Sequence, residues 1–359
     1  MNQELSMSTT HPTEALYTLC PLPIASNIAV ELGWLDEEFQ RVGARARYLR
    51  SLPDNQGWLP HFRHSRDDLI RDGGAVPALW ARADLSDTLL VASTASQRPG
   101  QILVRAGAGI RRVAQLAGCK VGVPRSANRE RIDVLNALAE QTLHYSLELA
   151  GLDREEVQVV EFEDHGDPRE LQPAQRPAAL WAQLREHHQA AAAVQALADG
   201  AIDALVVQAW QAPGLLQDGR FTVIEDLDRY PDWTLKNING PHATVVSRRL
   251  AEEHPEVVVA FLRAAIRAGR WINANPQAAA ELLPRFSVLR STTQARQWLS
   301  GLDLVPQLGA RNLAALELKK DFLHQRGYLR HDFRVSDWAD GRFLAQALDE
   351  LDEHATTRH

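Results

Sequence analysis

Residues 116–143, LAGCKVGVPRSANRERIDVLNALAEQTL, have the order strand, turn, helix. The apolar-rich run 120–123 predicts a short strand, which we expect Pro124 to end. Ser126 is then placed to cap the following helix. Residues 191–210, AAAVQALADGAIDALVVQAW, show the reverse order: an Ala-rich helix, a glycine stop and a buried strand. Alternation of this kind predicts an α/β protein with doubly wound sheets.

Further elements flank this centre. The segments ARYLRSL, DTLLVAS and QILVRA predict strands, bounded by glycine and proline. After Gly240 the pattern becomes mostly helical. The longest predicted helix begins at Pro255 and ends before Pro276, and its apolar residues recur at helical spacing. The 359 residues are enough for two lobes.

The composition excludes several classes of protein. Hydrophobic residues make up 45% and charged residues 24%, which is typical of a soluble globular protein. A net charge of −7 argues against a general nucleic-acid binder. The chain has no run of the roughly 18 apolar residues that span a membrane. Its first residues, MNQELSMSTTHPTEA, do not resemble a secretory signal, so we expect a cytoplasmic location and two free thiols. Without a sign of a large apolar interface, we expect a monomer.

One of the two cysteines, Cys20, precedes the proline-rich start of a predicted helix in TLCPLPIASN. A thiol at a helix N-terminus is favoured as a thiolate, because the helix dipole and free N–H groups stabilise negative charge. We therefore expect Cys20 to have a pKa below the roughly 8.5 of a free cysteine. The other cysteine, Cys119, borders a predicted core strand and is interpreted as structural.

Several phrases resemble substrate-binding proteins for sulfonates, nitrate and similar anions: LAGCKVGVPRS, LADGAIDALVV and FLHQRGYLRHDFRVSDWAD. This resemblance implies a two-lobed, periplasmic-binding-protein-like (type II) fold, in which each lobe is a mixed sheet flanked by helices and a cleft separates the lobes. It implies a discontinuous lobe one at 14–105 and 236–359, and lobe two at 106–235. Residues 1–13 are predicted to be disordered.

A narrower resemblance concerns three separated motifs: YTLCPLP at 17–23, HF at 61–62 and RDGG at 71–74. In order and spacing they are similar to motifs of the hydroxybiphenyl sulfinate desulfinases of dibenzothiophene desulfurisation. The resemblance implies that Cys20 is the nucleophile, His61 its histidine, Arg71 the sulfinate-binding arginine and Gly74 a backbone donor.

These residue types suit cleavage of a carbon–sulfur bond. The guanidinium of Arg71 is a planar fork that matches two sulfinate oxygens. Gly73 and Gly74 lack side chains, so their amides can approach an anion closely. A neighbouring His61 could lower the pKa of Cys20 and carry a proton. Either the thiolate attacks sulfur, or the thiol protonates the ipso carbon and sulfite departs. Neither route needs a metal or an organic cofactor.

The sequence leaves two other functions open. A non-catalytic binding protein for a sulfonate-like anion would feed a transporter, and a different cleft enzyme would use the same cysteine on a nitrogenous or carboxylate substrate. Other side chains are ambiguous. Arg125 and Ser126 either contact a ligand across the cleft or only cap a helix. The histidines at 61, 64, 187 and 188 lack the spacing of a known zinc site. One or two of the tryptophans Trp58, Trp80, Trp210 and Trp233 could wall a pocket.

Overall fold

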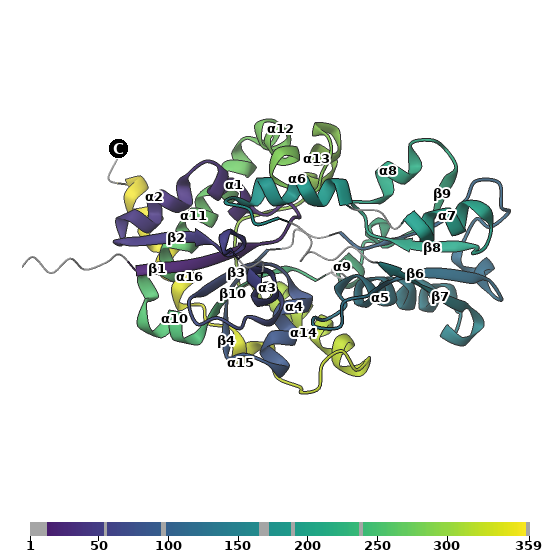
Figure 1. Cartoon of the computed structure of the whole chain (residues 1–359), viewed down its shortest axis with the longest axis horizontal. Helices are drawn as coiled ribbons and strands as arrows, with labels where there is room; N and C mark the ends of the chain where they lie inside the picture. Colours follow the sequence, from purple (N-terminus) through teal and green to yellow (C-terminus); the bar gives the residue numbers. More distant parts are fainter. Residues whose placement is uncertain are drawn as a thin grey trace, which may run out of the picture.

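The computed structural model describes residues 13–53, 56–94, 98–164, 172–187, 191–236 and 240–356. Two five-stranded sheets form two lobes that lie side by side along the longest axis of the molecule (Figure 1). The predicted two-lobed α/β architecture is therefore confirmed. Residues 1–12 of the segment predicted to be disordered lie outside the described residues, and Thr13 already belongs to the first strand. No helix in the described ranges is long and apolar enough to cross a membrane.

The sheet of lobe one places the ends of the first and third strands next to each other. Its order is β2 (Ala44–Tyr48), β1 (Thr13–Leu19), β3 (Leu69–Gly74), β10 (His242–Ser247) and β4 (Thr88–Thr94). β1 is parallel to both β2 and β3, whereas β10 is antiparallel to β3 and β4. Because β1 and β3 are parallel neighbours, the loops after them meet at one edge of the sheet.

The sheet of lobe two has the order β7 (Gln158–Asp164), β6 (Lys120–Ser126), β8 (Ala204–Val207), β5 (Gln101–Arg105) and β9 (Phe221–Asp226). The helices that follow or cover it are α5 (Val134–Ala150), α7 (Ala191–Asp199), α8 (Ala212–Leu216) and α9 (Trp233–Lys236).

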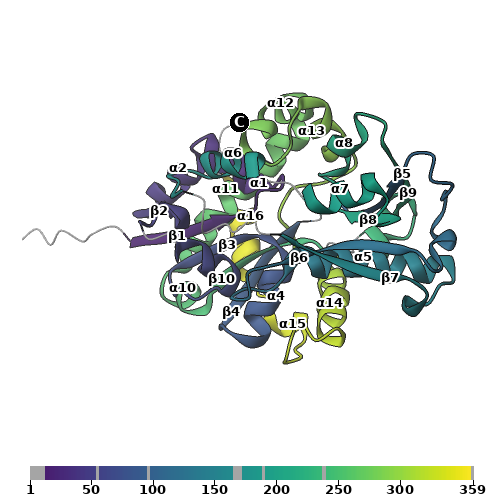
Figure 2. The ribbon, with the colours of Figure 1, turned by 45° about the vertical axis from the view of Figure 1, so that its right-hand side comes forward.

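The helices of lobe one come from both ends of the chain (Figure 2). They are α1 (Ala25–Glu31), α2 (Trp34–Arg41), α3 (Leu59–Arg63), α4 (Ala75–Asp84), α10 (Arg248–Glu253), α11 (Pro255–Ala274), α12 (Pro276–Phe286), α13 (Thr292–Leu299), α14 (Ala310–Gln325), α15 (Val335–Trp338) and α16 (Arg342–Thr356).

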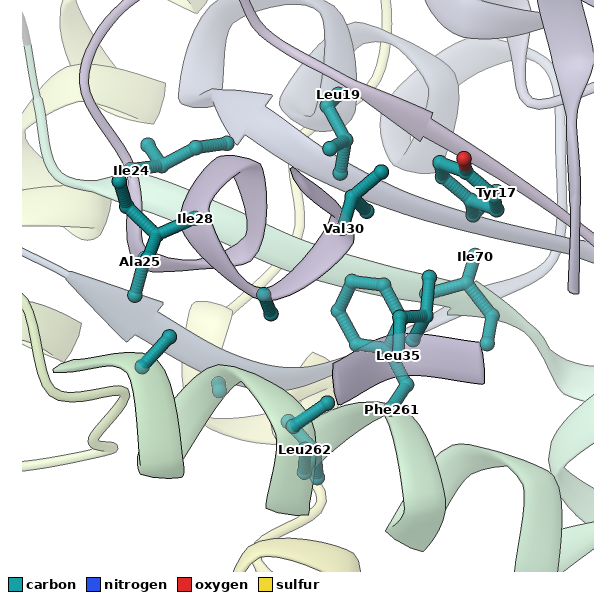
Figure 3. Close-up of a cluster of buried hydrophobic side chains, with 14 of the residues drawn as sticks. Tyr17, Leu19, Ile24, Ala25, Ile28, Val30, Leu35, Ile70, Phe261 and Leu262 are labelled. Carbon is teal, nitrogen blue, oxygen red and sulfur yellow. The ribbon is translucent and has the colours of Figure 1, made fainter. Parts of the chain in front are cut away.

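The core of lobe one lies between α1, α11 and the sheet. Figure 3 shows apolar side chains of α1, such as Ile28, above α11, which contributes Phe261 and Leu262. All three are at most 1% exposed. Burial of a side chain of this size stabilises the fold by about 1.5–3 kcal/mol. The strand end that carries Cys20 therefore rests on a rigid layer, to which Leu19 also belongs.

The expected end of β6 at Pro124 is wrong. The strand continues to Ser126, and Pro124 lies opposite Phe162 of β7. β8 pairs with β6 only at Val121 and Gly122, so Pro124 has a strand on one side alone, where a missing N–H is tolerated. Helix α5 begins at Val134, and its cap is Asp133, whose side chain accepts a hydrogen bond from the Asn136 amide. Ser126 therefore does not cap it.

The predicted lobe boundaries also need two corrections. β5, which the sequence division assigned to lobe one, pairs with β8 and β9 in the sheet of lobe two. Helix α6 (Pro177–His187), assigned to lobe two, packs its buried Leu180 and Trp181 into the core of lobe one. In Figure 1 α6 lies beside α12, in agreement with its contacts. A pattern of strands and helices shows the elements but not which sheet each one joins.

Candidate functional site

The loop that carries Cys20 follows β1 directly and is held by hydrogen bonds on three sides. The Cys20 amide donates to the carbonyl of Asp72 at 2.9 Å. Asn27 Nδ2 donates to the carbonyls of Cys20 (3.0 Å) and Leu22 (3.1 Å), and the Val288 amide donates to Pro21 at 2.8 Å. Helix α1 begins only at Ala25. The expected position of the thiol at a helix N-terminus is therefore wrong.

Cys20 is partly exposed as a residue, and its thiol has a raised pKa. Removal of the thiol from water raises its pKa most. The backbone amides of Leu22 and Gly74 and the charge of Arg71 lower the pKa. The carboxyl of Asp72 raises it again. The predicted low pKa is thus contradicted, because loss of water around the sulfur outweighs the donors that favour a thiolate. The thiol is protonated at neutral pH.

Arg71 lies on β3 with 1% of its surface exposed. Its Nε donates to the carbonyl of His61 at 2.7 Å, and its Nη2 donates to the carbonyl of Gly74 at 2.9 Å. Nη1 has no hydrogen-bond partner among the described residues. Burial lowers the pKa of Arg71 to about 10, so the side chain keeps its charge at neutral pH. A buried, charged N–H donor is thus left for an anion.

Gly73 separates the cysteine from the arginine. A Cβ added at Gly73 would lie 2.9 Å from Cys20 Cβ and 3.4 Å from Arg71 Nη2. Both side chains therefore approach the backbone here to within the space of one methyl group. The sequence predicts that Gly73 and Gly74 allow close approach to an anion, and the structure shows this approach for the thiol and the guanidinium.

His61 joins the site through Arg71 rather than through the sulfur. Its Nδ1 lies 2.9 Å from Thr18 Oγ1 and its Nε2 lies 3.5 Å from Arg71 Nη2. A guanidinium only donates, so Nε2 is the acceptor and Nδ1 carries the proton that Thr18 accepts. Burial, Arg71 and Arg131 together hold the pKa of His61 well below its usual range. The neutral ring stacks on Trp58 at 5.4 Å. Direct proton exchange with Cys20 is therefore not built into this geometry.

Two buried polar residues that the sequence analysis did not single out, Asp72 on β3 and His242 on β10, lie next to the site. Asp72 accepts hydrogen bonds from Ser26 Oγ (2.6 Å) and Thr244 Oγ1 (3.3 Å). Burial raises its pKa to about 6 despite these bonds. His242 pairs with Gly74 across β10 and β3, and burial lowers its pKa to about 3. Asp72 stands inside the RDGG motif, which was the one available signal; His242 gave none.

Lobe two touches the helix that carries His61. Arg63 Nε on α3 donates to the carbonyl of Glu130 at 2.8 Å. The guanidinium of Arg131 lies 4.7 Å from the centre of the Phe62 ring. Both contacts bring the segment between β6 and α5 over α3. The lobes therefore close on the side where the candidate histidine lies.

The remaining candidate residues lie elsewhere. Arg125 forms an ion pair with Glu161 at 2.8 Å rather than facing Cys20. The partly exposed Cys119 donates to the carbonyl of Gln115 at 3.5 Å, and its structural role stays a prediction. No group of three or more His, Cys, Asp or Glu side chains in the described ranges could hold a metal ion. His188, one of the four histidines considered for zinc, lies outside those ranges.

Comparison with known proteins defines the class first. No family model matches the chain. The periplasmic aliphatic sulphonate-binding protein SsuA from Escherichia coli has the same fold, with a TM-score of 0.65 and 15% identity over 92% of each chain. The periplasmic nitrate-binding protein NrtA from Synechocystis is more distant, with a TM-score of 0.57 and 10% identity over 95% of this chain and 89% of that one. The predicted periplasmic-binding-protein-like fold is confirmed.

A more specific match agrees with the three sequence motifs. The chain is 28% identical to the 2'-hydroxybiphenyl-2-sulfinate desulfinases of Rhodococcus erythropolis and Rhodococcus qingshengii, over 92% of this chain and 93% of theirs. A crystal structure of a cysteine-to-serine mutant of the desulfurization enzyme DSZB, in complex with biphenyl-2-sulfinic acid, has a TM-score of 0.75 and 25% identity over 94% of this chain and 99% of that one. The chain is therefore a homologue of these desulfinases, as the motifs predict.

Proposed function

We propose that this protein is a desulfinase that cleaves the carbon–sulfur bond of an aromatic sulfinate with water, to give the arene and sulfite. The overall change is ArSO2⁻ + H2O → ArH + HSO3⁻, which needs no oxidant or reductant. The homologous desulfinases and the DSZB complex with biphenyl-2-sulfinic acid support this substrate class. The single observation in this chain that supports it best is the buried Nη1 of Arg71, a charged donor without a hydrogen-bond partner in the described ranges.

Binding of the sulfinate is the first task of the site. Arg71 Nη1 would donate to one sulfinate oxygen, with a contribution of about 1.5–3 kcal/mol for a hydrogen bond to a charged group. The complete bidentate fork is not available, because Nε and Nη2 already donate to carbonyl oxygens of His61 and Gly74. The backbone amides of Leu22 and Gly74, which are directed at the Cys20 sulfur, would donate to the second oxygen.

Of the two routes, the raised pKa of Cys20 favours protonation of carbon. In this route the S–H bond of Cys20 breaks, its proton goes to the ipso carbon, and the carbon–sulfur bond electrons supply the new C–H bond. Sulfur dioxide leaves and takes up water to give bisulfite, and a proton returns to the thiolate. A bound sulfinate raises the thiol pKa further, since it places a second negative charge nearby. The protonated thiol is thus the form present when substrate is bound.

His61 is a positioning residue in this proposal. Its carbonyl and its Nε2 contact Arg71, and its Nδ1–H fixes the ring against Thr18. The ring thereby fixes which guanidinium nitrogen remains for substrate. Because the ring is neutral, it adds no charge that would compete with Arg71 for the anion.

Sulfite release from an aromatic sulfinate tests the proposal. The wild-type protein should produce sulfite from biphenyl-2-sulfinate, and Cys20→Ser should bind the sulfinate with similar affinity but release none. Cys119→Ser is the matched control and should keep full activity, because Cys119 lies on lobe two, away from Arg71. Binding without turnover by the wild type would identify a carrier for a sulfonate-like anion instead. Turnover by Cys20→Ser would remove the cysteine from the chemistry.

The monomeric state and the cytoplasmic location stay predictions from the sequence. Light scattering of the purified protein tests the first, and fractionation of cells that express the native gene tests the second.

A further inference from the structure

A cavity of about 510 Å³ lies between the lobes beside α4, α5 and the end of α14. This volume is within the range of about 300–1,000 Å³ that is usual for small-molecule sites. Trp80 and Tyr328 wall it from lobe one, and β6, β7 and α5 wall it from lobe two. None of Cys20, His61 and Arg71 lines it. These three residues therefore lie outside the cavity, whereas its Arg131 also contacts Phe62 of the neighbouring helix α3.

The lining of this cavity carries more positive than negative charge. It contains five arginines and three carboxylates, an excess of two positive charges: Arg125, Arg129, Arg131, Arg154 and Arg326 against Asp133, Glu140 and Glu161. The whole chain, by contrast, has a net charge of −7. A local positive field inside a negative protein selects anions at that place.

The carboxylates of the lining are already engaged. Glu161 accepts from Arg125 at 2.8 Å, and Glu140 lies 3.6 Å from Arg326. Asp133 caps α5, as described above. Arg154 donates only to the carbonyl of Val157, at 3.4 Å, and the exposed Arg129 forms no ion pair within the described ranges. Two guanidinium groups are thus left to meet an anion that enters.

The uncharged lining is aromatic and aliphatic. The hydroxyl of Tyr328 lies 2.6 Å from Asn136 Oδ1 and 2.8 Å from Glu140 Oε2, which fixes the ring at the cavity wall. Trp80 is partly exposed and faces the same space. Aromatic rings in a lining that also carries arginines suit a planar ring that bears an oxyanion.

We propose that this cavity is a binding site for a small aromatic oxyanion, of the arenesulfonate or arenecarboxylate class. Its anionic group meets an arginine of the lining that forms no ion pair in the described ranges, Arg129 or Arg154, and its ring packs against the aromatic lining, Trp80 or Tyr328. The proposal concerns binding alone and does not depend on desulfinase activity.

Calorimetric titration of the full chain with benzenesulfonate tests this site. Cys20 is first alkylated with iodoacetamide, which blocks the candidate sulfinate site. The alkylated protein should bind one equivalent. The double variant Arg129→Ala/Arg154→Ala should bind at least tenfold more weakly, whereas Arg111→Ala/Arg112→Ala, which removes two exposed arginines that do not line the cavity, should bind as the unchanged protein does.

Three results would overturn the proposal. Loss of binding after alkylation would place the ligand beside Cys20, and equal weakening in both double variants would reduce the effect to net charge. Inorganic sulfate, which lacks a ring, should bind at least tenfold more weakly than benzenesulfonate. Equal affinity for the two ions would contradict an aromatic site.

Discussion

Replacement of Gly73 by alanine tests the close approach of Cys20 and Arg71. The new Cβ would lie 2.9 Å from Cys20 Cβ, whereas carbon atoms prefer a separation of about 3.5–4.0 Å. Cys20 must therefore move by roughly 0.6–1.1 Å, and its loop is held by Asn27, so the strain cannot relax freely. A shift of about 1 Å in a reacting group can cost about 100-fold in rate, or about 2.7 kcal/mol.

Sulfite release gives kcat/KM for Gly73→Ala, and alkylation of Cys20 by iodoacetamide reports on the thiol separately. We expect a fall of about 100-fold in kcat/KM and a loss of about 1–3 kcal/mol in unfolding free energy. Gly214→Ala is the control, because an added Cβ there meets no atom within 4 Å. If Gly73→Ala keeps wild-type kcat/KM and the wild-type alkylation rate, the short Cys20–Gly73–Arg71 spacing is not required, and our account of the site is wrong.

Four further predictions concern the same site. Arg71→Lys should lower kcat/KM by at least tenfold, because the single ammonium of lysine would bond to the carbonyl oxygens of His61 and Gly74 and leave no donor in the place of Nη1 for the sulfinate. Unchanged KM and kcat would contradict this. The raised pKa of Cys20 predicts a kcat/KM that stays constant through neutral pH and falls only as the pH rises above the pKa of an ordinary cysteine, about 8.5. A kcat/KM that decreases as the pH is lowered from about 8.5 towards 7 would instead favour a thiolate nucleophile. Asp72 has a folded-state pKa of about 6 against about 3.9 in the unfolded chain, so the folded state binds more protons between these pH values. The unfolding free energy should therefore fall by about 2–3 kcal/mol as the pH rises from 4 to 6. Urea unfolding of Asp72→Asn should lack this fall, and a pH profile identical to that of the wild type would show that another group is responsible. Thr18→Val removes the hydroxyl that accepts from the Nδ1–H of His61 and should lower the unfolding free energy by about 1–3 kcal/mol in thermal unfolding, whereas Thr18→Ser should keep it. Equal stability of the two variants would show that the Thr18–His61 hydrogen bond does not stabilise the fold.

The proximity of Cys20 and Arg71 could be predicted from the sequence. Cys20 follows one strand and the RDGG motif ends another, and the structure makes these strands parallel neighbours. The order and spacing of the motifs therefore predicted that the thiol and Arg71 lie together, even though the strand order of the sheet was not known.

The errors come from properties that local patterns do not contain. The pKa of Cys20 depends on burial by residues distant in sequence, and a helix dipole was invoked for a helix that begins only at Ala25. His61 was expected to exchange a proton with the sulfur because the resemblance implies it, whereas its two ring nitrogens contact Thr18 and Arg71. Pro124 was treated as a strand breaker because propensity does not show that β8 pairs with only part of β6.

The position of helix α6 limits which segments of this chain can be exchanged with those of a relative, either in an engineered chimera or by recombination. Trp181 is completely buried in the first lobe, and its Nε1 donates to Asn27 Oδ1 at 3.4 Å, the side chain that also secures the cysteine loop. A graft of the whole chain segment between β4 and β10 from a relative would bring a foreign α6, and an α6 without this tryptophan would leave a cavity of indole size beside Asn27. The two halves are thus not interchangeable modules, and a working chimera must keep residues 177–187 with the half that holds the thiol.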